Sequence, residues 1–88
     1  MKKNDNKKES LPPIEVIDLF CGIGGLSFGM KSRGFNILAG YDLDATCRYA
    51  YETNNEAKFI HKDIKAVSSD EIRATYGKGS IRVLAGCA

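Results

Sequence analysis

Hydrophobic positions along this sequence fall into short blocks, and two kinds of block alternate along the chain. Runs rich in β-branched and aromatic residues predict four strands, at 14–20, 35–41, 58–61 and 81–85. The stretches between them predict helices at 26–33, 45–54 and 70–76, each followed by glycine or ended by asparagine. Asp44 and Ser69 precede the second and third helices and are expected to cap them.

The alternation of strands and helices predicts an α/β fold with a parallel sheet, because crossover helices cover the faces of such a sheet. We expect the element order β-α-β-α-β-α-β. With strands numbered along the chain, the expected sheet order is 3-2-1-4, half of a doubly wound sheet. Strands 14–20 and 81–85 are nearly continuous apolar runs, as strands buried on both faces are. A ligand is expected outside the carboxyl ends of the strands, between the first and the fourth.

The composition is that of an ordinary globular domain. The chain has 88 residues, 43% hydrophobic and 27% charged, which excludes collagen-like, low-complexity and wholly disordered chains. Its length predicts one domain at most. No apolar run approaches the roughly 18 residues that a membrane helix needs. The basic start leads into Leu11-Pro12-Pro13 instead of an apolar stretch, so we expect neither a signal peptide nor a membrane segment.

The net charge of +2 belongs to the first residues. Residues 1–10 hold four lysines against Asp5 and Glu9, so of 13 basic and 11 acidic residues the remaining chain keeps nine of each. We expect residues 1–13 to form a disordered basic leader, favoured over a nucleic-acid contact, and 14–88 to form the domain. The body of the chain shows no basic patch.

The cysteines indicate a reducing compartment. Cys21, Cys47 and Cys87 are widely spaced, without the CxxC spacing of zinc or redox sites. Their odd number does not resemble a disulfide framework. A cytoplasmic location is therefore expected.

Three features follow three successive strands and together predict a nucleoside site. The first is a glycine turn, Gly22-Ile23-Gly24-Gly25, where the backbone turns sharply and lets a ligand come close. The second is Asp42, at an offset where an acid commonly binds ribose hydroxyls. The third is Asp63-Ile64, suited to an adenine amino group and ring. Each has a plainer interpretation, as a tight turn or an exposed turn carboxylate, and their occurrence in order favours the site.

Two common nucleotide motifs fit poorly. Ser27 stands where the dinucleotide pattern GxGxxG needs its last glycine, which disfavours an NAD-dependent oxidoreductase. The phosphate loop GxxxxGK[ST] is absent from the sequence, which disfavours a nucleoside triphosphatase.

The segment 18–26, DLFCGIGGL, resembles the first motif of the DNA cytosine-5 methyltransferases, D-L-F-x-G-x-G-G. The resemblance implies the first half of a Rossmann-like methyltransferase fold that binds S-adenosylmethionine, with DNA as substrate and bacterial restriction-modification as the commonest setting. It implies that the turn lines the methionine part, that Asp42 binds ribose, and that Leu43, where the family often has tryptophan, contacts adenine. The implied cofactor residues are Phe20, Gly22, Ile23, Gly24, Gly25, Leu26, Asp42, Leu43, Asp63 and Ile64.

The same resemblance places the catalytic cysteine outside these residues. The family carries it in Pro-Cys-Gln just past the fourth strand, so the nucleophile is expected just beyond Ala88, and Cys87 is not favoured for the role. Cys21 is expected to pack. The chain is thus interpreted as the N-terminal part of a DNA (cytosine-5-)-methyltransferase, inactive alone, with DNA bound by the remainder. The alternative is a non-catalytic nucleoside-binding or partner-pairing module of Rossmann type, which associates with itself or a second chain through the apolar edge 81–85.

Overall fold

The computed structural model describes residues 11–86; the leader predicted at 1–13 lies mostly outside this range, and Cys87 lies outside it entirely. The strands are β1 (Ile14–Leu19), β2 (Asn36–Asp42), β3 (Lys58–His61) and β4 (Ile81–Gly86). The α-helices are α1 (Gly25–Ser32), α2 (Arg48–Asn55) and α3 (Ser69–Thr75). The predicted alternation is confirmed: β3 has the predicted bounds, and the boundaries of the other elements differ from the prediction by one to three residues.

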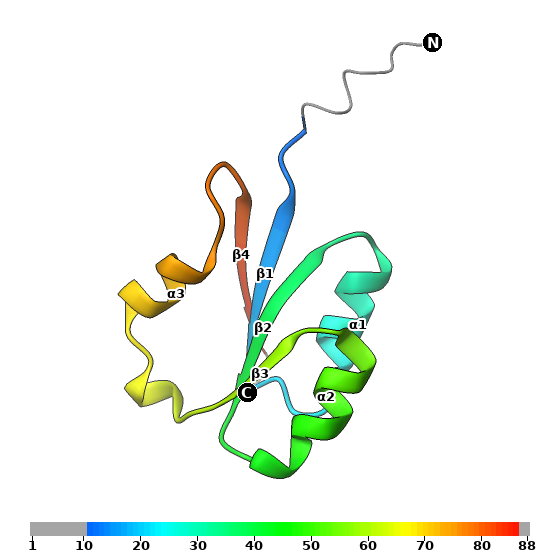
Figure 1. Cartoon of the computed structure of the whole chain (residues 1–88), viewed down its shortest axis with the longest axis vertical. Coiled ribbons are helices and arrows are strands. Elements are labelled where there is room, and N and C mark those ends of the chain that lie inside the picture. The colour runs from blue at the N-terminus through cyan, green and yellow to red at the C-terminus, as the bar shows by residue number, and fades with distance from the viewer. Residues whose placement is uncertain (1–10, 87–88) are drawn as a thin grey trace.

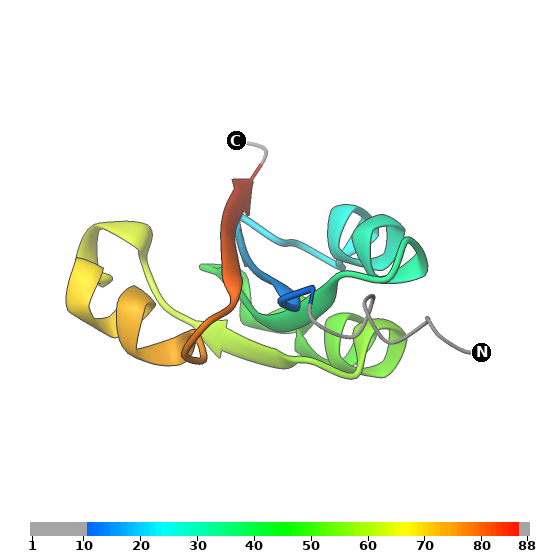
Figure 2. The same cartoon turned by 90° about the horizontal axis from the view of Figure 1, so that it is seen from above.

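The sheet has the predicted order, β3-β2-β1-β4, and all its pairings are parallel. Helices α1 and α2 cover one face and α3 lies on the other, as Figures 1 and 2 show. Because the strands run the same way, their carboxyl ends meet at one edge of the sheet, the lower edge in Figure 1. This edge is where the three polar features of the sequence come together.

Strand β1 lies in the middle of both hydrophobic cores. Val16 packs with Tyr51 and Phe59 on the α1–α2 face, and Ile17 packs with Tyr41 and Tyr76 on the α3 face. Val16 and Ile17 are completely buried, as predicted for a strand covered on both faces. Each such aliphatic side chain contributes about 1.5–3 kcal/mol on burial, so β1 is a rigid base for the turn that follows it.

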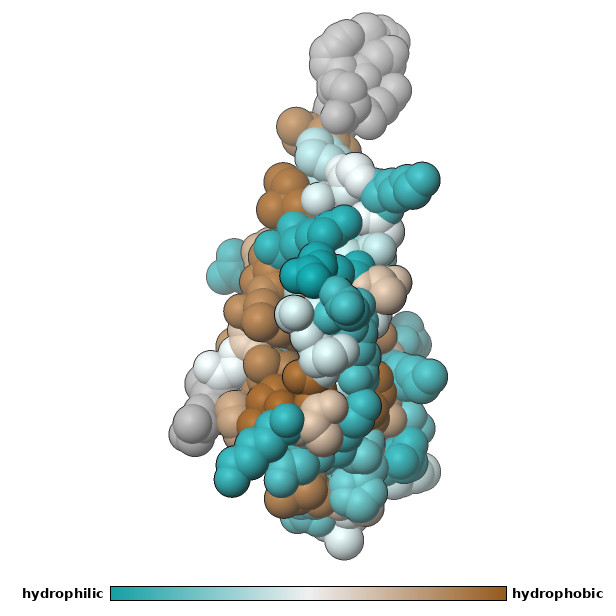
Figure 3. Space-filling model, turned by 90° about the vertical axis from the view of Figure 1, so that its left-hand side faces the viewer, coloured by the Kyte–Doolittle hydropathy of each residue, from teal (hydrophilic) through white to brown (hydrophobic). Residues whose placement is uncertain are grey.

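The same prediction was wrong for β4, whose residues are all exposed or half-buried. Among residues 11–86 the strand pairs with β1 alone and lies at the edge of the sheet, with α3 on one of its faces. Ile81 and Leu84 are each about half exposed, at 48% and 55%. Figure 3 looks onto this side of the molecule and shows apolar side chains gathered on it. An apolar run therefore signalled an edge strand here, because sequence alone does not say what lies beside a strand.

Two helix starts also differ from expectation. Ser68, and not Ser69, caps α3, with its Oγ accepting the Glu71 N–H at 3.0 Å. Asp44 acts as a cap as predicted and accepts the Thr46 N–H at 3.0 Å, but it begins a 3₁₀ turn (Ala45–Cys47) that precedes α2. None of the helices within 11–86 has the length and apolar character needed to span a bilayer.

Candidate functional site

The turn after β1 has an unusual backbone. Phe20, Gly22 and Gly24 all have positive φ, at 57°, 54° and 95°. For glycine this conformation is free of strain, but for a bulky residue such as Phe20 it costs on the order of 1–3 kcal/mol. Hydrogen bonds hold the turn: the Cys21 N–H donates to the Tyr41 carbonyl at 3.0 Å, and the Gly24 N–H donates to the Cys21 carbonyl at 2.9 Å. A strained residue retained at a strand end is typical of functional sites.

The glycines of this turn are required for different reasons. A Cβ on Gly24 would lie 2.3 Å from Asn55 Nδ2 and 2.7 Å from Tyr51 Cδ1, so packing excludes a side chain. A Cβ on Gly25 would meet no atom within 4 Å, and its φ is not positive. Neither strain nor packing within the described residues therefore requires glycine at 25. The open space above it is what close approach of a ligand to the backbone needs.

Asp42 is the last residue of β2 and is bonded to the turn. Its Oδ2 accepts the Gly22 N–H at 2.8 Å, and its Oδ1 accepts the Asp44 N–H at 2.9 Å. Each carboxylate oxygen has about two acceptor positions, so one on each oxygen is left for a further donor. The structure thus places Asp42 beside the glycine turn, with a free acceptor position on each carboxylate oxygen. Two neighbouring hydroxyl groups, as in a vicinal diol, could donate to these positions.

Asp63 and Ile64 follow β3 on the same edge. Asp63 Oδ1 accepts the Lys65 N–H at 3.0 Å and caps a 3₁₀ turn (Ile64–Ala66). A backbone bond from the Lys62 N–H to the Asp42 carbonyl, 3.1 Å long, ties the end of β3 to the end of β2. This bond fixes the position of Asp63 and Ile64 relative to Asp42.

A pocket of about 240 Å³ lies between these strand ends. Its lining combines predicted site residues with two that the sequence analysis missed, Tyr41 and Lys62. The predicted residues that line it are Phe20, Asp42, Leu43, Asp63 and Ile64. The lining thus combines two carboxylates and one lysine with apolar and aromatic side chains, and a few polar groups among apolar ones are typical of pockets that bind small molecules.

The remaining predicted residues lie along the turn. Ile23, Gly24 and Gly25 line a second hollow of about 300 Å³ together with Phe28 and Asn54. Gly22 and Leu26 line neither of these hollows: Gly22 donates its N–H to Asp42, and Leu26 is 42% exposed on α1. The turn therefore separates into a part bonded to Asp42 and a part facing the second hollow.

A buried polar chain beneath the turn was not predicted. Asp18 and Ser27 are completely buried, and the Ser27 Oγ donates to Asp18 Oδ2 at 2.6 Å. The Tyr51 hydroxyl lies 2.8 Å from the same Ser27 Oγ. Burial raises the pKa of Asp18 above its ordinary value, with the Asp42 carboxylate as a smaller cause. Two features of the sequence point to this chain: an acid inside an apolar strand, and a serine where the GxGxxG pattern needs glycine.

On the face of the sheet that carries α3, a second polar cluster includes two residues that line the 240 Å³ pocket, Tyr41 and Lys62. Glu71 of α3 accepts from the Tyr41 hydroxyl and from Lys62 Nζ, each at 2.8 Å. The Lys62 ammonium, and then the Tyr41 hydroxyl, hold the pKa of Glu71 below its ordinary value. This cluster fastens α3 to the ends of β2 and β3 near the pocket.

The described thiols are not activated. Cys21 is buried as expected, and burial raises the pKa of its thiol to about 12. Partial burial also raises the pKa of Cys47, which packs against the α1–α2 core. A reactive cysteine needs the opposite shift. Within residues 11–86, no group of three or more His, Cys, Asp or Glu side chains is placed to hold a metal ion.

The fold matches that of a solved enzyme. A crystal structure of a TehB-like SAM-dependent methyltransferase from Corynebacterium glutamicum superposes with a TM-score of 0.57 at 18% identity, covering 73% of this chain and 35% of that one. At this identity the likeness concerns the fold alone, which is that of the Rossmann-like methyltransferases.

Sequence relatives are more specific. The type II methylase M.HgiDII of Herpetosiphon aurantiacus is 51% identical over 73 residues, 83% of this chain and 21% of that protein. The type II methyltransferase M.FnuDI of Fusobacterium nucleatum is 38% identical over 64 residues, 73% of this chain and 19% of that protein. The chain thus spans about a fifth of the length of these curated relatives. The family model described as C-5 cytosine-specific DNA methylase matches residues 14–88. With this match added to the D-L-F-x-G-x-G-G turn, the chain belongs to the family of C-5 cytosine-specific DNA methylases.

Proposed function

We propose that this chain forms the S-adenosylmethionine-binding part of a DNA (cytosine-5-)-methyltransferase, with residues 14–88 as the partial cofactor-binding domain and 1–13 as a basic leader. The observation that carries the proposal is the pocket at the carboxyl edge of the sheet. It brings residues from the ends of β1, β2 and β3 around one space of about 240 Å³. S-adenosylmethionine, when bound, supplies the methyl group for cytosine in DNA.

The chemistry of the lining fits this cofactor. Asp42 has free acceptor positions for the ribose hydroxyls while it holds the Gly22 N–H. Leu43 and Ile64 offer apolar contacts to the adenine ring, and Asp63 offers an acceptor for its amino group. The open backbone at Gly25 lies at the start of α1, where amide N–H groups favour the carboxylate of the methionine part.

The chain by itself is proposed to lack methyl transfer. The nucleophile of this chemistry is a thiolate, and the described thiols, Cys21 and Cys47, have raised pKa values. Residues 11–88 carry equal numbers of basic and acidic residues, so DNA contact is assigned to the remainder of the enzyme. The proposed setting is a reducing, cytoplasmic one, on the odd number and wide spacing of the cysteines.

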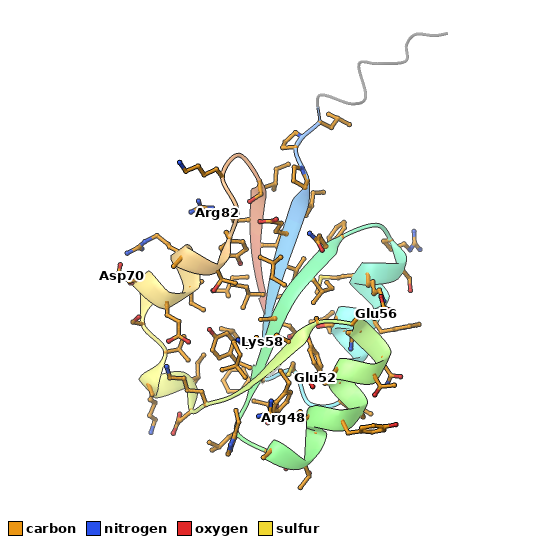
Figure 4. All side chains as sticks on the ribbon, viewed as in Figure 1. Arg48, Glu52, Glu56, Lys58, Asp70 and Arg82 are labelled. Atoms are coloured by element: carbon orange, nitrogen blue, oxygen red, sulfur yellow. The ribbon has the colours of Figure 1, made fainter. Side chains whose placement is uncertain are left out.

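Cofactor binding tests the proposal directly. Equilibrium dialysis with S-adenosylhomocysteine, S-adenosylmethionine and NAD should show a preference for the first two in a sample shown to be folded by circular dichroism. Asp42→Ala should weaken their binding by about 1–3 kcal/mol, because a charged acceptor is lost. Asp70→Ala is the matched control, because it removes the same charge from α3. Figure 4 shows Asp70 on the other side of the sheet from Arg48 and Glu52, which belong to α2.

Two results would overturn the assignment. One is equal binding of NAD and S-adenosylhomocysteine by the folded chain. The other is an unchanged dissociation constant in Asp42→Ala, which would remove Asp42 from the site. Methyl transfer to DNA by this chain alone would contradict its proposed inactivity.

The exposed edge of β4 favours a second role, pairing with another chain or a second copy. In the part of the chain that the structure describes, the strand is paired with β1 alone and Leu84 is 55% exposed, so backbone groups and apolar surface are both available for pairing. Light scattering should show association that rises with concentration and that Leu84→Lys weakens. Tyr49→Lys, a change at a residue on α2 that is 80% exposed, is the control. A stable monomer at high concentration would rule out self-association.

A further inference from the structure

The side chain of Tyr51 connects helix α2 to the glycine turn from below. It is completely buried. Its ring lies against two glycines: a Cβ on Gly24 would come within 2.7 Å of Cδ1, and a Cβ on Gly40 within 2.4 Å of Cζ. One of these glycines belongs to the turn and the other to β2. The ring therefore fills a space that is available only because Gly24 and Gly40 lack side chains.

The hydroxyl of Tyr51 joins the buried polar chain that Ser27 and Asp18 form. Ser27 donates its single proton to Asp18, so the 2.8 Å contact between Ser27 and Tyr51 has the tyrosine as donor. The donors thus run from Tyr51 to Ser27 to the Asp18 carboxylate. Burial raises the pKa of Tyr51 to about 12, which keeps its hydroxyl protonated as this direction requires.

A neighbour one helical turn away reinforces the contact. Asn55 is 2% exposed and donates its Nδ2 to the Tyr51 carbonyl at 3.1 Å and to the Gly24 carbonyl at 3.4 Å. The buried face of α2 therefore touches the turn through a ring, a hydroxyl and an amide. None of Tyr51, Ser27, Asp18 and Asn55 lines the 240 Å³ pocket.

We infer that Tyr51 is a positioning residue for the amino-acid half of the cofactor: through Ser27 and Asp18 it sets the glycine turn, while the adenosine half is held separately by the pocket at the strand ends. The inference rests on the proposed function. A residue needed only to fill the core requires no hydroxyl at this position, and a buried hydroxyl is costly unless it is bonded. The polar end of Tyr51 is directed at the start of α1, beside the hollow lined by Gly24 and Gly25.

The variant Tyr51→Phe separates these halves, because it keeps the ring and removes the hydroxyl. We expect the dissociation constant for S-adenosylhomocysteine to rise about three- to tenfold, the size of one lost hydrogen bond, and that for adenosine to stay unchanged. Both are measured by equilibrium dialysis at equal folded fraction. Tyr49→Phe is the control on the same helix: its ring is 80% exposed, and neither constant should change.

Ser27→Ala should produce the same selective loss. If the two hydroxyls act as one chain, the variant with both changes should weaken S-adenosylhomocysteine binding no more than the more damaging single change does, because the effects of coupled residues are not additive. Additive losses would overturn the inference. So would equal weakening of S-adenosylhomocysteine and adenosine in Tyr51→Phe, the result of a merely structural role, or no weakening at all.

The two proposals fail in different ways. If the folded wild-type chain binds neither S-adenosylhomocysteine nor adenosine, the proposed function fails and this inference with it. If the wild-type chain binds both and Tyr51→Phe does not separate them, the positioning role alone is overturned.

Discussion

Gly40 is a position where one added methyl group should lower the stability of the fold measurably. It lies within β2, and its missing side chain leaves room for the ring of Tyr51. In Gly40→Ala the new Cβ would lie 2.4 Å from Tyr51 Cζ, 2.5 Å from its Oη and 2.8 Å from Cys21 Sγ. Contacts below 3.0 Å force atoms apart, and Tyr51 and Cys21 belong to the same buried cluster, with little free space to move into.

The size of the effect follows from two opposing contributions. Overpacking a well-packed core costs about 1–3 kcal/mol. Replacing glycine lowers the entropy of the unfolded chain and returns about 0.4–1 kcal/mol. We therefore expect Gly40→Ala to lower the free energy of unfolding by about 1–2 kcal/mol. Gly29→Ala is the matched control. Gly29 lies in α1 with no atom within 4 Å of a new Cβ, so it should raise this free energy by about 0.5–1 kcal/mol.

Urea unfolding followed by circular dichroism measures both variants. With an m value of about 1 kcal/mol/M for a small domain, Gly40→Ala should lower the midpoint by about 1–2 M. The two variants should therefore move the midpoint in opposite directions. A Gly40→Ala chain as stable as the wild type would refute the packing of Tyr51 against β2, on which the positioning role depends.

Three further outcomes follow from the structure. Glu56→Gly should raise the unfolding free energy by about 1 kcal/mol in urea melts, because Glu56 ends α2 with a φ of 53°; a loss of stability would contradict this. Phe20→Gly should relieve similar strain and keep the chain folded by circular dichroism, yet weaken adenosine in dialysis, since the ring lines the pocket; unchanged adenosine binding would count against that lining. The pKa of Glu71 is lowered by Lys62 and Tyr41, so its stabilisation is present above the ordinary value of 4.5 and is lost as pH falls below it; Glu71→Gln should flatten this acid loss in thermal melts, and an unchanged pH profile would refute it.

Much of the fold could be predicted because its signals are local. Apolar runs and the glycine, asparagine and capping residues between them define strands and helices within a few residues of chain, and their alternation leaves few sheet orders to choose from. The order 3-2-1-4 and the family are confirmed. The motif positions also put Asp42 and Asp63 at the ends of β2 and β3, as the structure has them. That these residues bind a cofactor remains a prediction.

What only the tertiary structure decided concerns contacts between distant positions. The sequence shows Gly24 and Gly40 as two glycines, but only packing shows that both make room for Tyr51, because helix α2 must first dock on the sheet. In the sequence, Ser27 is only a departure from the GxGxxG pattern, whereas in the structure its hydroxyl lies between Asp18 and Tyr51 and contacts both. The apolar run at β4 predicted burial, yet no described element covers its outer edge. Local patterns are encoded by neighbouring residues, whereas burial and hydrogen-bond partners depend on which distant segments meet.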